Sequence, residues 1–414
     1  MKYLIKKAKI TQKGNSLNGK RMDILIEGGK ITKIQKDISS PKAHVVESKN
    51  LWISDGWVDV GTHLGEPGHE HRETFSTLAD AAKAGGFTDL VVMPNTVPPV
   101  QTKSQVTQIK NMGQTFGISI HPIGALSTDL KGENISEYVD LHHAGAIAFS
   151  DGLHPVEKGG LLMRALQYSK AFDGMIIHQP NDHSLAEQDM IHEGDVSTAL
   201  GMKGSPALAE EMTVHRDIEL THYAEAKLTL HQLSTKGSTN LVKSAKKKGI
   251  QLYAGVSYLN LIKTDEDLKE FDTNLKVLPL IRSKTDQRAL IKAIKDNTID
   301  YIASNHVPLE VEKKLLEYPY ADHGAIGLET CFAGLITFVG KDLDILTIIN
   351  KLTEGPRSTF GLGPIKIEVG SKARITCFDP TMNWEYKKDD IKSTSFNSPF
   401  INQEFTGKVI ATIC

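Results

Sequence analysis

The chain has 414 residues, 40% of them hydrophobic and 24% charged, which is the composition of a globular protein rather than of a disordered chain. Its 48 Lys and Arg stand against 50 Asp and Glu, and the absence of a block of like charges excludes the electrostatic footprint of a nucleic-acid or membrane partner. Three widely spaced cysteines and the lack of a long apolar run predict a cytoplasmic protein without membrane spans.

Short strands are predicted at both ends of the chain. Residues 23–27 and 30–34 alternate apolar and polar side chains on either side of Gly28 and Gly29, a turn suited to positive φ. Further strands are predicted over residues 3–10, 365–370, 373–378 and 408–413. We therefore expect a small β-sandwich domain formed from both chain termini, residues 1–55 and 357–414.

Between these ends, strand-like runs alternate with segments of helical period, which is the pattern of βα units. Eight strands are predicted, the number that a closed parallel barrel needs. They cover residues 57–60, 89–93, 119–123, 146–149, 174–177, 227–230, 251–255 and 301–303. The predicted helices cover residues 74–84, 161–171, 205–223, 239–248 and 286–297. The predicted fold class is α/β, with a (β/α)8 TIM-like barrel over residues 56–356.

Histidine is frequent among the polar residues that follow the predicted strands. Barrel enzymes place their chemistry at these strand ends, and imidazole and carboxylate groups suit a borderline divalent ion. The residues at these positions are Asp59, His63, Asn95, Asp151, His178, His231, Gln232, Asn305 and His306. They indicate either a metal-type pocket or a set of histidines satisfied by hydrogen bonds.

Several motifs resemble those of the dihydroorotase family of cyclic amidohydrolases. They are Asp59-Val-Gly-Thr-His-Leu-Gly-Glu-Pro-Gly68, Ala84-Gly-Gly-Phe-Thr88, Val92-Met-Pro-Asn-Thr96 and Phe396-Asn-Ser-Pro-Phe400. The likeness covers nearly the whole chain and implies a zinc-dependent barrel that acts on dihydroorotate in pyrimidine synthesis. In the family, one or two zinc ions make hydroxide from water and polarise the ring carbonyl, and an aspartate shuttles the proton.

The chain departs from the family pattern where that chemistry is carried out. Gly61 stands at the first His of the family motif Asp-x-His-x-His-x-Arg, His63 keeps the second, and Gly65 replaces the Arg that clamps the substrate carboxylate. Gln232 aligns with a histidine ligand, and Asn305 stands at the position of the proton-shuttling aspartate. An amide cannot accept a proton near neutral pH, so the general base is predicted to be lost.

Four positions still match the family's site. His63, Asp151 and His178 match metal ligands, and Asn95 matches a residue of the substrate clamp. His231 lies one place from Gln232, and because alternate residues of a strand face opposite sides, it is not expected to replace that ligand. The remaining set predicts no metal or one weakly held ion, and no catalytic residue is assigned.

The sequence therefore predicts a dihydroorotase-like protein without catalytic activity, acting as a structural or regulatory partner in pyrimidine biosynthesis. Non-catalytic members of the family imply aspartate transcarbamoylase, or an active dihydroorotase, as the partner. A homo-oligomer is expected, and no nucleic acid or membrane partner. The alternative is an active metal-dependent cyclic amidohydrolase with a reduced ligand set, either a dihydroorotase or a hydantoinase- or allantoinase-like enzyme.

Overall fold

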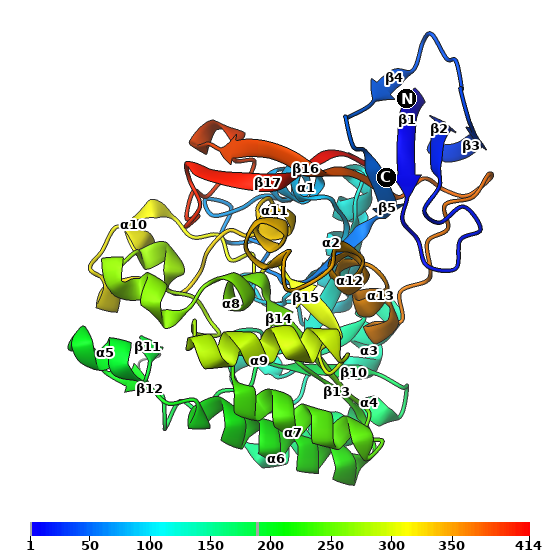
Figure 1. The fold of residues 1–414 in the computed structure, drawn as a ribbon. Helices are drawn as coiled ribbons and strands as arrows, with labels where there is room; N and C mark the ends of the chain where they lie inside the picture. Colours follow the sequence, from blue (N-terminus) through cyan, green and yellow to red (C-terminus); the bar gives the residue numbers. More distant parts are fainter. Residues whose placement is uncertain (1, 188–189) are drawn as a thin grey trace.

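Two large β sheets organise the computed structural model, which describes residues 2–187 and 190–414 (Figure 1). One sheet consists of eight parallel strands in chain order and forms the barrel. Its strands are β6 (Trp57–Thr62), β7 (Phe87–Val92), β8 (Ser119–Ala125), β9 (Ala148–Ser150), β10 (Met175–His178), β13 (Lys227–Leu230), β14 (Leu252–Ser257) and β15 (Tyr301–Ala303). Each of the eight predicted strands overlaps one of these, which confirms the predicted barrel.

The second sheet is built from both ends of the chain, as predicted. In spatial order its strands are β17 (Gln403–Ile413), β16 (Ile375–Tyr386), β5 (Trp52–Asp55), β1 (Lys2–Ile10), β2 (Arg21–Glu27) and β3 (Lys30–Gln35), with β4 (His44–Val46) paired to β1. The hairpin between β2 and β3 turns at Gly28 and Gly29, whose φ angles are 58° and 75°. Two short strands, β11 (Ile191–His192) and β12 (Gly204–Ser205), form a separate pair.

Helices fill the connections between the barrel strands, and all five predicted helices are present. The longer ones are α1 (Phe75–Gly85), α2 (Lys103–Thr115), α3 (Tyr138–Ala144), α4 (Gly159–Lys170), α6 (Leu208–Ala224), α7 (Lys236–Lys247), α9 (Lys284–Lys295) and α12 (Ile345–Leu352). The shorter ones are α5 (Asp195–Ala199), α8 (Tyr258–Ile262), α10 (Val311–Lys314), α11 (Cys331–Gly334) and α13 (Glu354–Thr359). Among residues 2–187 and 190–414, no helix combines the length and the apolar character needed to cross a bilayer.

Alternation along the strands divides the core in two. Val58 and Val60 of β6 point into the barrel, where they join a buried cluster with Ile177 of β10. Trp57 belongs to the larger cluster outside the barrel, and its ring lies 4.8 Å from that of Phe332. Because successive residues of a strand face opposite sides, one strand serves both cores.

The first and last barrel strands, β6 and β15, are joined by side-chain and backbone bonds. The buried carboxylate of Asp59 accepts hydrogen bonds from the backbone N–H of Ser304 at 2.6 Å and from its hydroxyl at 2.8 Å. The N–H of His63 donates to the carbonyl of His306 at 3.0 Å. Asp59, one of the predicted strand-end residues, thus closes the barrel.

The strand predicted over residues 365–370 is not formed. This segment is irregular, although Ile367 is buried in the core of the terminal sheet. The side chain of Gln12 takes the place of a strand partner: it donates to the carbonyl of Ile365 at 2.8 Å and accepts from the N–H of Ile367 at 3.1 Å. Side-chain amides therefore satisfy backbone groups that a neighbouring strand would otherwise bind.

Asp89 in β7 ties the barrel to the chain's C-terminal segments. Its buried carboxylate accepts from Arg357 of α13 at 2.7 Å, from Arg374 at 2.9 Å and bonds to His121 at 2.9 Å. Burial alone would raise the pKa of Asp89, but the His121 hydrogen bond and the two guanidinium groups hold it well below its usual value. The ionised carboxylate is therefore the form that the fold stabilises.

We expect Asp89→Asn to lower the free energy of unfolding by about 3–5 kcal/mol, because it leaves the buried Arg357 without its counter-charge. Asp173→Asn removes an ion pair with Lys227 in which the Asp173 side chain is 80% exposed, and should cost below about 1 kcal/mol. Since the folded pKa of Asp89 is depressed, its contribution is present above the unfolded value of about 3.9 and is lost as pH falls through the folded pKa. Urea unfolding of both variants from pH 3 to pH 8 measures this, and equal losses for the two would contradict the assignment.

Candidate functional site

An open cavity of about 1040 Å3 lies at the carboxyl ends of the barrel strands. Its wall includes His63 just after β6 and Asn95 after β7, together with Arg72, His154 and residues 319–323. This is the position and size of ligand pockets in many barrel proteins. Of the predicted site residues, the cavity brings together His63 and Asn95.

His63 faces this cavity, half-buried, as a neutral imidazole. Neither of its ring nitrogens makes a hydrogen bond within the part of the chain that the structure describes. Desolvation, followed by the charges of His306, His154 and Arg72, lowers the pKa of His63 to about 3. The ring is therefore uncharged near neutral pH, with a lone pair open to the cavity.

Gly61, at the position where the resemblance implies a metal-binding histidine, faces the imidazole of His231. A Cβ atom at Gly61 would lie 2.2 Å from Nε2 of His231, and the φ of Gly61 is +85°. Nδ1 of His231 lies 2.9 Å from the hydroxyl of Tyr301, inside the barrel. Burial, together with His63, lowers the pKa of His231 to about 3, so this ring is neutral as well. The ring of His231 thus occupies space that a side chain at position 61 would need.

His178, the last residue of β10, has both ring nitrogens engaged by the protein. Nε2 accepts a hydrogen bond of 2.8 Å from the backbone N–H of Val156. Nδ1 lies 2.5 Å from Oδ2 of Asp217 in α6, and the ring is 2% exposed. Because Nε2 must be the acceptor, the proton is on Nδ1 and is donated to Asp217. The Nε2 lone pair that a metal ion would need therefore already accepts a hydrogen bond from the Val156 backbone N–H.

Asp151 and Asn95, which the sequence assigns to metal binding and to substrate binding, are both hydrogen-bonded to nearby groups of the protein. The two carboxylate oxygens of Asp151 accept from the backbone N–H and the hydroxyl of Ser127, at 2.8 and 2.5 Å. Burial raises the pKa of Asp151, which these bonds counteract. Nδ2 of Asn95 donates to the carbonyl of Asp151 at 3.3 Å, while Oδ1 of Asn95 is buried without a partner in the described residues. Asp151 thus holds a loop in place.

Asn305 is buried two residues after β15 with a positive φ of 52°. Its Nδ2 donates to the carbonyl of Leu278 at 3.0 Å. Leu278 lines the cavity, so the amide acts as a bridge between two segments of the cavity wall. Gln232 is also buried with a positive φ, and its Nε2 has no partner among the described residues.

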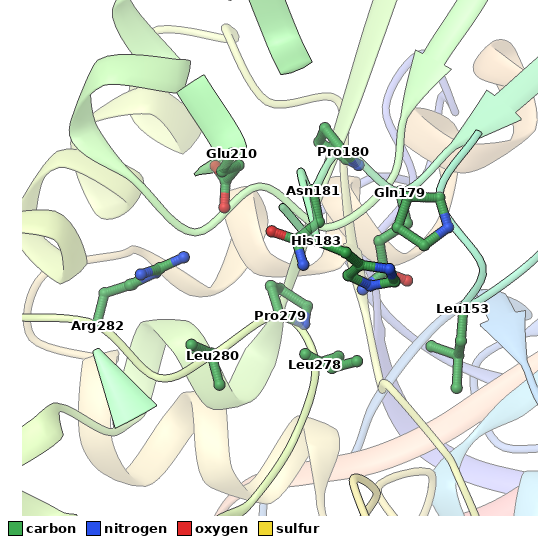
Figure 2. A pocket seen from close by; sticks show the side chains of 11 residues that line it. Leu153, Gln179, Pro180, Asn181, His183, Glu210, Leu278, Pro279, Leu280 and Arg282 are labelled. Carbon is green, nitrogen blue, oxygen red and sulfur yellow. The ribbon is translucent and has the colours of Figure 1, made fainter. Parts of the chain in front are cut away.

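A second cavity, of about 20 Å3, lies between Glu210 of α6 and the segment 278–282 (Figure 2). In Figure 2 the polar ends of Glu210 and Arg282 point toward one another. Glu210 accepts from the backbone N–H groups of Ser234 and Thr235 at 3.0–3.1 Å, and Nε of Arg282 donates to the Ser234 hydroxyl at 3.1 Å. A volume of about 20 Å3 has room for about one water molecule, and the polar network joins α6 to the segments that follow β13 and β14.

The donor set does not fit a metal centre. Within residues 2–187 and 190–414, no group of three or more His, Cys, Asp or Glu is arranged so that it could hold an ion. The sequence did not assign a role to His154, which faces the cavity and lowers the pKa of His63, or to Asp217, which orients His178. His154 follows Asp151 by three residues, so its place after a strand end was the available signal. Asp217 lies in the Arg216-Asp-Ile-Glu-Leu220 helix, which resembles the family's sequence but carries no indication of a contact with His178.

The family profile and the curated proteins that match this chain carry the same family name. A family profile described as Dihydro-orotase-like matches residues 51–238. A protein named Dihydroorotase from Thermoanaerobacter sp. (strain X514) is 38% identical over 395 residues, covering 94% of this chain and 91% of its own. Another of that name, from Acetivibrio thermocellus, is 37% identical over 413 residues, covering 99% of this chain and 97% of its own.

Solved structures share the fold at lower identity. The L-hydantoinase (dihydropyrimidinase) from Arthrobacter aurescens superposes with a TM-score of 0.85 at 23% identity, over 99% of this chain and 94% of its own. A dihydropyrimidinase from Brevibacillus agri NCHU1002 superposes with a TM-score of 0.82 at 20% identity, over 100% of this chain and 93% of its own. At this identity the likeness supports the barrel fold alone.

Gly61→Ala tests whether the His231 ring fills the position of the lost side chain. The added methyl group meets Nε2 of His231, and overpacking of this kind costs about 1–3 kcal/mol of unfolding free energy. Gly132→Ala is the matched control, because Gly132 has a φ of +65° and nothing within 4 Å of the new Cβ, so it reports the backbone strain alone.

A double-mutant cycle with His231→Ala separates the clash from that strain. In the double variant the ring is absent, so the combined loss should be smaller than the sum of the two single losses by about 1 kcal/mol or more. Additive losses in thermal or urea unfolding would show that the two positions do not share this space.

Proposed function

The chain belongs to the dihydroorotase-like family of amidohydrolases, and we propose that within it this protein is a non-catalytic homologue that holds no stoichiometric metal ion. The observation that carries the proposal is the hydrogen bond from the Val156 N–H to Nε2 of His178. A metal ion at this nitrogen would leave a buried N–H unpaired, at a cost of about 1–3 kcal/mol, or roughly 5- to 150-fold in affinity.

Two further positions support the same conclusion. Gly61 provides no ligand, and the imidazole of His231 stands in the space where a side chain at that position would lie. Zinc sites need three or four correctly placed donors. Of the three expected ligands, His178 has its Nε2 lone pair engaged by an N–H and Asp151 has both carboxylate oxygens bonded to Ser127, so His63 alone makes no hydrogen bond in the described structure. A single imidazole is too weak a site to keep an ion.

The residue expected to transfer protons, an aspartate at position 305, is also missing. Asn305 occupies the position expected for the catalytic aspartate, and its amide donates to the Leu278 carbonyl. An amide has no basic lone pair at neutral pH, so it cannot take a proton from water or return one to a leaving nitrogen. Metal loss and base loss concern different steps, and either one would reduce turnover by orders of magnitude.

A complete barrel that lacks hydrolase activity fits a structural or regulatory role in pyrimidine biosynthesis. We propose aspartate transcarbamoylase as the partner, or else an active dihydroorotase, within a cytoplasmic assembly in which this chain is itself oligomeric. The family membership supports the pathway, and the preserved core supports a role that needs the fold.

The alternative is an active cyclic amidohydrolase with a reduced ligand set. The open cavity favours it, because His63 and Asn95 still line a space of about 1040 Å3. The names of the curated relatives favour it as well. This reading requires the Val156–His178 hydrogen bond to break when a metal binds, and it requires a base other than Asn305.

Metal content and turnover distinguish the two. Protein produced in zinc-supplemented medium should contain below about 0.1 zinc per chain by mass spectrometry and should not open the ring of dihydroorotate or of a hydantoin, with or without added zinc. The Thermoanaerobacter protein named Dihydroorotase, purified in parallel, is the positive control for both measurements. One zinc per chain together with turnover of either substrate would overturn the proposal.

A further inference from the structure

Five large apolar side chains are exposed together near the cavity mouth. Leu315 is 81% exposed, Tyr320 72% and Val311 56%, and Phe271 and Leu316 are exposed by 45% and 43%. These five residues form what we call the α10 patch. In Figure 1, α10 lies at the outer left edge of the molecule.

Two contacts hold the segments that carry the α10 patch side by side. The Thr273 hydroxyl donates to the Lys314 carbonyl at 2.7 Å, and the ring of Phe271 meets that of Tyr318 edge-on at 6.2 Å. The N–H of Leu315 donates to the carbonyl of Val311 at 2.8 Å, which places their side chains one helical turn apart on the same side.

Two buried lysines fix the segment below the patch. Nζ of Lys314 donates to the carbonyl of Asp322 at 2.8 Å, and Nζ of Lys276 donates to the carbonyl of Pro319 at 2.8 Å. Both lysine side chains are buried, so these bonds hold residues 314–322 against residues 272–276. A surface held in this way is ordered before a partner arrives, which lowers the entropic cost of docking.

The area of the patch is that of a binding surface rather than of scattered apolar residues. With side chains of roughly 200 Å2 each, the exposed fractions amount to about 600 Å2, the upper end of what a monomeric protein exposes in one patch. A stable interface buries about 800 Å2 on each partner, so the patch and a polar rim would complete one.

The rim is acidic. Segments 265–273 and 310–322 hold nine Asp or Glu against three Lys and no Arg, and four of these carboxylates form ion pairs, with Lys263, Lys269, Lys313 and Arg72. Of the exposed carboxylates, Glu270, Glu312 and Glu317 have no ion pair within the described residues. Two copies of this chain docked through the patch would oppose like charges, which disfavours self-association here.

We propose that the α10 patch docks a different protein, one that presents an apolar face ringed by Lys and Arg. This inference rests on the proposed function, because a partner role is what gives the patch a use. Pro319 and Tyr320 also line the open cavity, so a docked partner would lie against the cavity mouth.

The test uses the purified full chain with aspartate transcarbamoylase from the same organism, mixed and measured by light scattering and by titration. Leu315→Ser with Tyr320→Ser removes apolar contact from the patch and should raise the dissociation constant at least tenfold. Met212→Ser with Tyr223→Ser on α6 is the matched control, since these side chains are 53% and 75% exposed outside the patch, and it should leave the constant unchanged. Glu312→Gln with Glu317→Gln should slow association and weaken its dependence on salt.

The possible outcomes distinguish a failure of the α10 patch as the docking surface from a failure of the proposed partner role. If the unaltered chain binds and the patch variant binds equally well, the patch is overturned while the proposed partner role stands. If the unaltered chain does not bind, the patch proposal and aspartate transcarbamoylase as the partner both fail, while the non-catalytic assignment is decided separately by metal content and turnover. If the chain alone forms a dimer that Leu315→Ser with Tyr320→Ser dissociates, the patch is a self-interface and the proposal of a basic-rimmed partner is wrong.

Discussion

The position of residues 156–157 against the barrel is fixed by one closed hydrogen-bond network around His178. The N–H of Val156 donates to Nε2 of His178, whose Nδ1–H donates to Asp217. Arg216 completes the circuit, since it donates to Asp217 at 2.8 Å and to the carbonyl of Val156 at 2.9 Å. Both backbone groups of Val156 are therefore satisfied by side chains, and a metal ion at His178 would have to break the network that orders the loop.

The positions that depart from the expected pattern are tied into the fold. The ring of His231 fills the space that a side chain at Gly61 would need, and Asn305 bridges two segments of the cavity wall. Buried polar groups need partners whatever their function, so hydrogen bonds to the fold are sufficient to hold these side chains in place. The wall of the open cavity is formed by the loops that follow the barrel strands, and the Asn305–Leu278 bond holds two of these loops together.

Much of this fold could be predicted from the sequence. The eight barrel strands follow from apolar runs spaced by helices, and the Gly28–Gly29 turn follows from the positive φ that it requires. The strand predicted over 365–370 was wrong because the side chain of Gln12, some 350 residues away in sequence, satisfies its backbone, and no local pattern reveals such a partner. The domain limits at residues 55 and 357 stay a prediction.

The candidate site was predictable in composition but not in geometry. Its substitutions could be read by position, whereas the contact between the His231 ring and Gly61 joins two segments far apart in the sequence, which no local pattern reveals. Likewise, the use of His178 Nε2 by a backbone N–H depends on how residues 152–158 fold back, which side-chain pattern does not encode.

The state of the His178 ring tests the account most directly. Proton–nitrogen correlation spectra of chain labelled with 15N-histidine, assigned with His178→Gln, report which ring nitrogen carries the proton and whether either binds metal. We expect Nδ1 to carry the proton and the ring nitrogen shifts to stay unchanged when one equivalent of zinc is added. A stoichiometric zinc-dependent shift of Nε2 would show that the Val156 bond yields to a metal ion, and would contradict this expectation.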